Sequence, residues 1–319
     1  MAKGAPQSVV EVGSKVAGWT VLRAIGKGSS GTVYEVEKRK QRAALKVIVP
    51  DVENQDALPR FRREVKLLQE VRHPNVVRLL SWGEGDFLWL ILEFLPNSVE
   101  GFLAENERAS VPQAVGILRG VLDGLQAMHD KGVVHRDIKP DNLLLGKGGV
   151  VKLADFGLAR RDSSSTSLTR TGVVLGTPFY MAPEQCRGAD LDGRTDLYAC
   201  GVLLYHLLTG RPPYFGSTSL EVLQQHMAGD VPDLRQALPA APPQLARAVG
   251  RLMAKRPDDR PATAQQAKAL FDGLPAARLP PPRPQRNHPG RSGPQDELVA
   301  EAVPVAEAVP AARGARAAS

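Results

Sequence analysis

Short apolar stretches separated by turn residues dominate the first third of the chain. Three Val-rich runs, divided by glycines or by the charged turn KRKQR, have the pattern of β-strands and lie at residues 19–26, 31–39 and 42–49. Residues 59–71 differ, because their apolar positions recur every three or four residues and so predict one amphipathic helix. Strand character returns over residues 73–95, with GEGD at 83–86 as a hairpin turn.

The rest of the chain has longer apolar patterns of helical type. Four stretches predict helices, at residues 111–132, 197–210, 219–229 and 244–256. A small sheet-rich part followed by a larger helical part is an α+β arrangement. The extended piece LPNS, at residues 95–98, is the natural joint between the two parts.

The composition changes after residue 275 to Pro, Arg and Ala, and VAEAVP occurs twice in tandem, at 299–304 and 305–310. Residues of these types bury little apolar surface, and this cannot offset the entropy lost when the chain is ordered. Residues 276–319 are therefore predicted to be disordered. The chain carries a net charge of +7, but this segment holds only six arginines against four acidic residues. That excess does not indicate a basic arm, and no nucleic-acid partner is expected.

The two cysteines, Cys186 and Cys200, have neither the spacing of a zinc site nor the density of a disulfide framework. The first residues lack the apolar core of a secretory signal, and no stretch reaches the ~18 apolar residues that a membrane span needs. These features favour a cytoplasmic location and no membrane span in this chain. Cys200 lies in an apolar run and is predicted to be a small buried hydrophobe.

Gly26, Gly28 and Gly31 form a G-x-G-x-x-G pattern, which alone fits either a flexible surface turn or a phosphate-binding loop. A dinucleotide-binding fold requires a helix directly after the glycines, whereas a strand pattern follows here. A Walker loop ends in G-K-[ST], and this chain reads GTV. Both of those folds are excluded. A glycine-rich hairpin whose backbone N–H groups approach phosphates is still open.

Charged residues elsewhere favour the phosphate-binding alternative. Lys46, in AALKVI, read alone is most simply a solubilising charge, but with Glu64 as counter-charge it supplies a cation for phosphates. The polar residues of VVHRDIKPDNLLL lie between apolar stretches, which is costly unless they have partners or a ligand. Asn142 and Asp155, 13 residues apart, are oxygen ligands suited to Mg²⁺. Asp137 is then a carboxylate that can accept a proton from a hydroxyl group.

Six motifs follow one another in the chain: GKGSSGTV, AALK, Glu64, HRDIKPDN, DFG and APE. Their order and spacing resemble the signature of protein kinases over roughly residues 19–273. The resemblance implies the bilobal protein-kinase fold, in which a small antiparallel sheet lobe with one helix precedes a larger, mainly helical lobe. The implied parts are an N-terminal extension (1–18), a kinase domain (19–275) made of N-lobe (19–92), hinge (93–96) and C-lobe (97–275), and the tail (276–319).

The resemblance further implies ATP as phosphate donor, with Mg²⁺ as its metal. The residues implied in ATP binding are Gly26, Lys27, Gly28, Ser29, Ser30 and Gly31 over the phosphates, Lys46 with Glu64, Val33, Ala44 and Leu144 around the adenine, the backbone of Glu93 and Leu95 at its edge, and Asp155. Asn142 and Asp155 are implied to hold Mg²⁺. Asp137 is implied to position and deprotonate the acceptor hydroxyl, and Lys139 to reach the γ-phosphate.

Lys139 and Thr177 resemble the residues of serine/threonine kinases, so proteins with Ser or Thr acceptors are the expected substrates. Two threonines ahead of the GT of GTPFYMAPE, Thr169 and Thr171, resemble those of bacterial receptor-type kinases. A phosphothreonine there can pair with Arg136, which precedes the catalytic aspartate, and order the loop. Autophosphorylation at Thr169 or Thr171 is therefore expected, through a transient homodimer.

Several other polar residues are expected to be structural. Glu184 and Arg260 resemble the pair that forms a buried ion pair in this family, and Asp196 resembles the aspartate that hydrogen-bonds the HRD backbone. His135 is expected to pack against Phe156. His129 has no second metal ligand nearby in the sequence and is expected to be structural.

Two other functions compete with protein phosphorylation. A pseudokinase would bind nucleotide without transferring phosphate, but it usually lacks Lys46, Asp137 or Asp155, and all three are present. A small-molecule phosphotransferase often lacks a segment such as GTPFYMAPE, which this chain has. Both are disfavoured.

Overall fold

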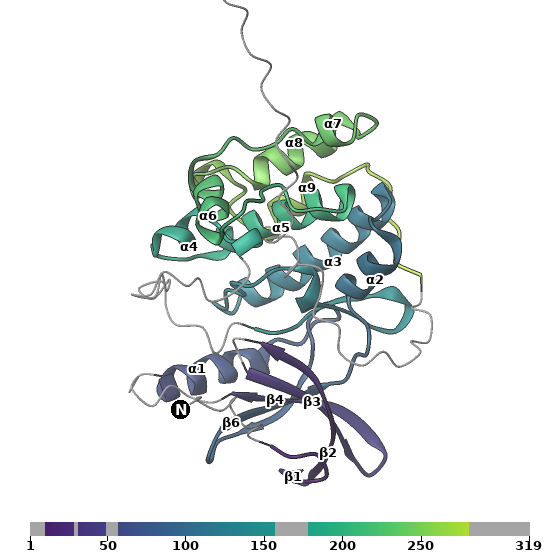
Figure 1. Ribbon diagram of the computed structural model, residues 1–319, viewed down its shortest axis with the longest axis vertical. Coiled ribbons are helices and arrows are strands. Elements are labelled where there is room, and N and C mark those ends of the chain that lie inside the picture. The colour runs from purple at the N-terminus through teal and green to yellow at the C-terminus, as the bar shows by residue number, and fades with distance from the viewer. Residues whose placement is uncertain (1–9, 29–30, 49–56, 157–177, 281–319) are drawn as a thin grey trace, which may run out of the picture.

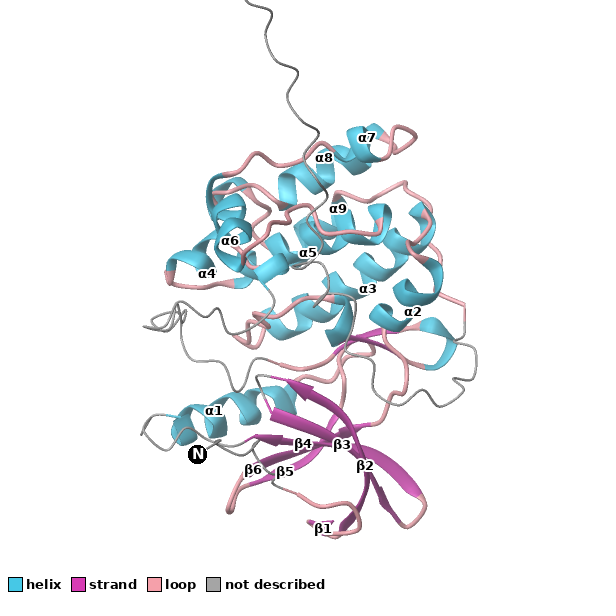
Figure 2. Ribbon diagram, in the orientation of Figure 1, coloured by secondary structure: helices cyan, strands magenta, loops and turns pink. Residues whose placement is uncertain are grey.

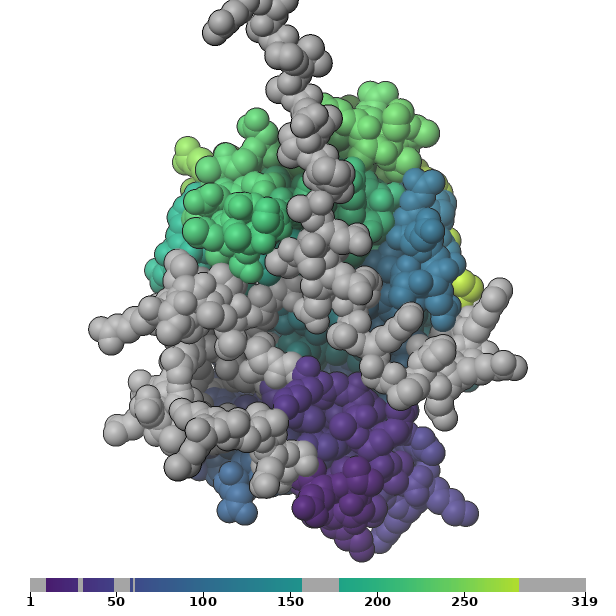
Figure 3. Space-filling view, viewed as in Figure 1, coloured from purple at the N-terminus to yellow at the C-terminus, as the bar shows by residue number. Residues whose placement is uncertain are grey.

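A computed structural model describes residues 10–28, 31–48, 57–156 and 178–280 of the chain. Strands gather at one end of the molecule and helices at the other, so that the chain forms two lobes (Figures 1 and 2). The N-terminal lobe occupies one end of the space-filling view and the helical lobe the other (Figure 3). The predicted α+β, two-lobed architecture is confirmed.

The N-terminal lobe is built on a six-stranded antiparallel sheet. In the order β1-β2-β3-β4-β6-β5, its strands are Lys15–Val16, Trp19–Gly28, Gly31–Lys38, Gln41–Ile48, Leu88–Glu93 and Leu79–Gly83. The three predicted N-terminal strands are confirmed as β2, β3 and β4. The predicted hairpin turn at 83–86 is confirmed as well, because it joins the antiparallel pair β5 and β6.

One helix, α1 (Ala57–Glu70), lies alongside this sheet (Figure 1). Its predicted apolar stripe is buried, since Phe61, Val65 and Leu68 are each at most 2% exposed. Phe61 meets Trp82 of β5 edge to face, with ring centroids 6.0 Å apart. The stripe therefore fixes the helix against the sheet, which determines where its polar residue Glu64 lies.

Residues ahead of the first predicted strand also belong to the packed lobe. Val10 and Val16 are buried in a second apolar cluster with Trp19 and Val21. Strand β1 pairs with β2 through Val16 and Trp19. The packed lobe therefore begins before residue 19. The sequence pattern did not show this, because a two-residue strand is too short to produce an alternation.

Eight α-helices are described in the C-terminal lobe: α2 (Val99–Asn106), α3 (Val111–His129), α4 (Pro183–Arg187), α5 (Gly193–Thr209), α6 (Ser219–Ala228), α7 (Leu234–Ala237), α8 (Pro243–Leu252) and α9 (Ala264–Ala269). The four predicted helices are confirmed as α3, α5, α6 and α8. The other four are short, so their sequences carry few turns of helical periodicity.

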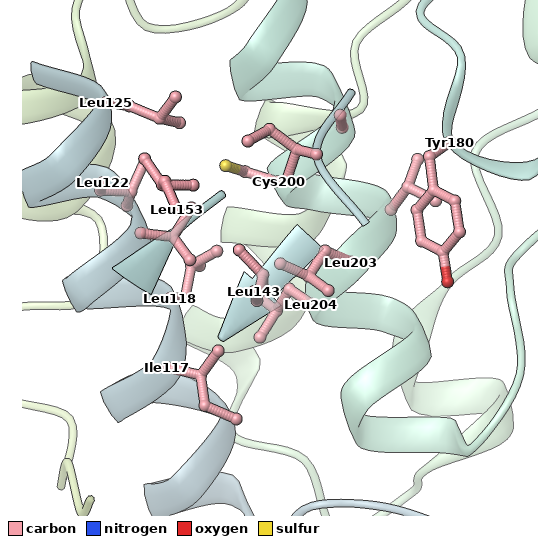
Figure 4. Close-up of a cluster of buried hydrophobic side chains, with 14 of the residues drawn as sticks. Ile117, Leu118, Leu122, Leu125, Leu143, Leu153, Tyr180, Cys200, Leu203 and Leu204 are labelled. Atoms are coloured by element: carbon pink, nitrogen blue, oxygen red, sulfur yellow. The ribbon is translucent and has the colours of Figure 1, made fainter. Parts of the chain in front are cut away.

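The core of this lobe lies between α3, α5 and a small two-stranded sheet. Figure 4 shows Leu118, Leu122 and Leu125 of α3 together with Cys200 and leucines of α5. Cys200 is fully buried, as predicted for a small hydrophobe. The small sheet consists of β7 (Leu143–Leu145) and β8 (Val151–Leu153), an antiparallel pair that follows Asn142 and precedes Asp155 in the chain.

Candidate active site

Lys46 lies on β4, in the middle of the N-terminal sheet, with Val33 of β3 and Leu90 of β6 as its neighbours in register. It is only 3% exposed, and its ammonium forms an ion pair with the carboxylate of Asp155, 109 residues further along the chain. A buried ammonium group needs such a counter-charge to remain ionised. The structure thus joins two of the predicted site residues across the lobes. Glu64 lies on α1 and is half-buried, and its orientation of Lys46 stays a prediction.

The glycine loop is the turn between β2 and β3, where Gly28 and Gly31 are opposite each other. Gly31 has φ of +128°, and a methyl group there would overlap the carbonyl oxygen of Val47. Only glycine fits this position without strain. Gly26 and Lys27 lie at the end of β2, whereas Ser29 and Ser30 lie outside the described residues.

The residues predicted to surround adenine come from both lobes. Val33 and Ala44 lie on β3 and β4, and Leu144 lies on β7, where it bridges to Ser98 at the start of α2. Glu93 ends β6 and Leu95 follows it in the connection between the lobes. The Glu93 side chain accepts hydrogen bonds from Lys152 at 2.7 Å and from the backbone N–H of Arg78 at 2.8 Å. Glu93, at the start of the connection, is thus bonded to the N-terminal lobe through Arg78 and to the C-terminal lobe through Lys152.

The loop before β7 brings Asp137, Lys139 and Asn142 together. The Asn142 Nδ2 donates to the backbone carbonyl of Asp137 at 2.8 Å and to its Oδ2 at 2.9 Å. The Lys139 ammonium lies 3.7 Å from the same Oδ2. The backbone N–H of Ala154 donates to the Asn142 carbonyl at 2.8 Å, which holds this loop next to Asp155. The predicted catalytic and metal-binding residues therefore form one cluster.

A buried carboxylate holds the backbone just before Asp137 in place. Asp196 of α5 accepts hydrogen bonds from the backbone N–H groups of His135, at 2.9 Å, and Arg136, at 2.7 Å, which confirms its predicted role. Arg136 has φ of +66°, a left-handed conformation that costs free energy in a residue with a side chain. The hydrogen bonds to Asp196 hold the loop in this conformation.

His129 is a partner of that carboxylate, in keeping with its predicted structural role, although the sequence did not indicate which residue it contacts. Its Nε2 lies 2.8 Å from the Oδ2 of Asp196. Burial alone would raise the pKa of Asp196, but the hydrogen bond and charge of His129, together with those of His135, outweigh it and hold that pKa below its ordinary value. His129 and Asp196 are 67 residues apart, and no local pattern indicates their contact.

The remaining structural predictions are confirmed. The His135 ring lies 5.9 Å from that of Phe156, and its Nε2 lies 2.9 Å from the Ala154 carbonyl oxygen. Glu184 and Arg260 form a bidentate buried ion pair, with N–O distances of 2.6 and 2.9 Å. Thr169, Thr171 and Thr177 lie outside the described residues.

The oxygen atoms of Asn142 and Asp155 fit a magnesium ion better than a transition metal. Within residues 10–28, 31–48, 57–156 and 178–280, no group of three or more His, Cys, Asp or Glu side chains is arranged to hold a metal. Mg²⁺ needs only one or two protein oxygen ligands when substrate phosphates and water complete its shell. Lys46, which pairs with Asp155, adds the cation that phosphates require.

Glu100, in the first turn of α2, adds an unusual carboxyl group close to the charges of Lys139 and Asp141. Its Oε2 is buried without a hydrogen-bond partner among the described residues. Burial, followed by the charge of Asp141, raises the pKa of Glu100 to about 7, against an ordinary value of 4.5, although Lys139 acts in the opposite direction. Between these two pH values the folded state binds more protons than the unfolded state. The free energy of unfolding therefore falls as the pH rises through this window.

We expect Glu100→Gln to be more stable than wild type at pH 8, by about 1 kcal/mol after allowance for solvent screening and for the helix N-terminus, which favours a negative charge. At pH 4.5 the two proteins should differ little, because the glutamate is then largely neutral. Urea unfolding at both pH values measures the difference. Glu105→Gln, an exposed change in the same helix, is the control. Equal pH dependence in both variants would contradict the prediction.

No helix among the described residues combines the length and apolar character of a membrane span. This finding concerns only those residues.

Comparison with known proteins identifies the family to which this site and fold correspond. A family model described as protein kinase domain matches residues 19–271. The chain is 40% identical over 293 residues to serine/threonine-protein kinase pkn2 of Myxococcus xanthus, covering 86% of this chain and 33% of that protein. It is 37% identical over 281 residues to serine/threonine-protein kinase PknL of Mycobacterium tuberculosis, covering 85% of this chain and 70% of the relative.

A third relative, serine/threonine-protein kinase PrkC of Bacillus subtilis, is 30% identical over 311 residues, which cover 95% of this chain and 47% of that protein. The chain thus spans from a third to 70% of the length of these relatives. With the cluster of Lys46, Asp137, Asn142 and Asp155 in place, the chain belongs to the protein kinase domain family, among the serine/threonine protein kinases of bacteria.

Proposed function

We propose that the chain transfers the γ-phosphate of ATP to serine and threonine hydroxyls of protein substrates. The observation that carries this proposal is the cluster in which Asn142 donates to the carboxylate of Asp137 while the backbone links it to the neighbour of Asp155. One site thus holds a potential base, two oxygen ligands and two lysines. A nucleotide-binding scaffold has no use for such a base next to the metal ligands.

Each residue then has a role that follows from its position. Lys46 would bind the α- and β-phosphates, and Asp155 would hold the metal together with Asn142. Asp137 orients the acceptor hydroxyl and takes its proton, and Lys139 neutralises charge on the γ-phosphate. Mg²⁺, when bound with ATP, offsets the charge of the phosphates during transfer. Because the reaction passes through a loose transition state, positioning and charge neutralisation supply most of the catalysis.

The proposal is tested with the full chain, Mg·ATP labelled on the γ-phosphate and a generic basic protein. We expect label on serine and threonine, loss of transfer on chelation of Mg²⁺, and recovery when Mg²⁺ is restored. Nucleotide binding is measured separately by calorimetry. Binding without any transfer would favour the pseudokinase alternative, and label on a small-molecule hydroxyl alone would favour a small-molecule phosphotransferase.

Autophosphorylation at Thr169 or Thr171 is a second part of the proposal, with a transient homodimer as the reacting species. Two features of the sequence support this part: the two threonines of that segment, and Arg136, which directly precedes Asp137 and carries a guanidinium group that can pair with a phosphothreonine. Mass spectrometry of active protein should find phosphate on at least one of the two threonines, at a rate per molecule that rises with protein concentration. Active protein with neither threonine modified would contradict this part.

A further inference from the structure

The β7–β8 hairpin (residues 143–153) holds both candidate metal ligands at its open end. Asn142 directly precedes β7, and Asp155 follows β8 by two residues. Each strand has only three residues, and an isolated two-stranded hairpin is at best marginally stable in water. The position of the metal ligands therefore depends on what the hairpin packs against.

Each strand of this hairpin is held by a different part of the chain. On the β7 side, the Leu145 N–H donates to the carbonyl of Asn97 at 2.8 Å, in the connection between the lobes. On the β8 side, the Val77 N–H donates to the carbonyl of Leu153 at 2.8 Å. The side chain of Asn75 donates to the carbonyl of Val151 at 2.7 Å. The turn of the hairpin, at residues 146–150, is closed by hydrogen bonds of its own, from the Gly146 N–H to the Val150 carbonyl at 2.8 Å and from the Gly149 N–H to the Gly146 carbonyl at 3.2 Å. Those bonds set its shape but not its position against the rest of the lobe.

The chain after α9, residues 275–280, meets that turn and is called the C-terminal strap here. Gly149, in the turn, has φ of +72°, and a methyl group there would overlap the carbonyl oxygen of Leu279. The Leu279 side chain is only 3% exposed and belongs to the main apolar core. Residues 276–280 are therefore anchored through the buried Leu279, although the neighbouring side chains are exposed and the sequence predicted disorder from residue 276. One buried leucine between prolines and alanines leaves no periodicity to detect.

The other end of the strap rests on α3. The Ala277 N–H donates to the carbonyl of Pro112 at 2.7 Å, in the first turn of that helix. A methyl group at Gly116 would overlap the Ala277 carbonyl oxygen. The strap thus approaches the backbone of α3 at one glycine and the backbone of the hairpin turn at another. Such close packing at both ends fixes the turn relative to the largest helix of the core.

We propose that Leu279 is a positioning residue for nucleotide binding, which acts by holding the turn of the β7–β8 hairpin and so the placement of Asn142 and Asp155. This inference rests on the proposed function, since it assumes that these two residues bind the metal of Mg·ATP. The strap lies at the opposite end of the hairpin from the metal ligands. Its effect is therefore on their position and not on the chemistry itself.

The test compares, in the full chain, Leu279 of the strap with Leu274, which lies just before the strap. Leu279→Ala should raise the Kd for Mg·ADP, measured by calorimetry, about tenfold. Leu274→Ala is the matched control, because Leu274 is half-buried against the same core and has no described contact with the hairpin turn. It should lower the thermal midpoint and leave the Kd unchanged. Leu279→Met should restore the wild-type Kd.

Gly116→Ala gives a second test that leaves Leu279 intact. The added methyl group would push Ala277 away from α3, so this variant should also raise the Kd for Mg·ADP. If Leu279→Ala does not fold, Gly116→Ala is the variant that tests the inference. Equal Kd values for wild type, Leu279→Ala and Gly116→Ala would overturn the inference alone. A wild-type chain that binds no Mg·ADP would contradict the proposed function, and the role of Leu279 would fall with it.

Discussion

Asp137→Asn should lower kcat by a factor of about 10²–10⁴ while leaving nucleotide binding and stability close to wild type. An amide has nearly the shape of a carboxylate but cannot take a proton from the acceptor hydroxyl. The carbonyl of Asp137, which accepts one of the two hydrogen bonds from Asn142, belongs to the backbone and is unchanged. The loop should therefore keep its conformation. The measurement is a steady-state rate with a protein substrate, together with the Kd for Mg·ATP.

Lys46→Met is the comparison that separates chemistry from binding. It removes the ammonium that pairs with Asp155, so we expect a higher Kd for Mg·ATP as well as a loss of rate. Leu279→Ala should affect the Kd far more than kcat. Asp137→Asn protein that keeps the wild-type kcat would show that Asp137 is not the base. A large rise in its Kd would show that Asp137 acts in binding.

The separation between contacting residues decides how much of this site could be predicted from sequence. The stripe of α1 is local, and Phe61, Val65 and Leu68 indicated it directly. The pairing of Lys46 with Asp155 spans 109 residues. Periodicity carries no information at that distance, so only the resemblance to a family whose motifs occur in this order could bring them together.

Contacts that belong to no motif were not predicted. His129 ends α3 and meets Asp196 across the core, yet in the sequence it is a single histidine without a neighbouring ligand. Val10 and Val16 lie where valines are mixed with polar residues and glycine, and Leu279 lies in a Pro-rich stretch. Their burial follows from surfaces that exist only after the sheet and α3 have formed. Tertiary packing therefore determines their state, and local propensity does not.

Arg260→Ala should lower the free energy of unfolding by about 3–5 kcal/mol. Arg260 and Glu184 are 3% and 6% exposed. The guanidinium also donates to the carbonyl of Ala254, at 2.8 Å, and of Arg194, at 2.9 Å, and lies over the ring of Tyr198. Removing it leaves the Glu184 carboxylate buried without its counter-charge. Lysine should not substitute, because it lacks the planar fork that makes the bidentate pair.

Two controls make this prediction specific to burial. Lys268 and Asp123 form an ion pair of 2.6 Å on the surface, where both side chains are more than a third exposed. Lys268→Ala should therefore cost less than about 1 kcal/mol. The double variant Glu184→Leu with Arg260→Met removes both charges and should recover much of the lost stability, since the cost comes from an unpaired buried charge. Urea unfolding measures all three variants. A double variant as unstable as Arg260→Ala would mean that the hydrogen bonds of Arg260 to the backbone, and not its pairing with Glu184, hold α4 against the rest of the lobe.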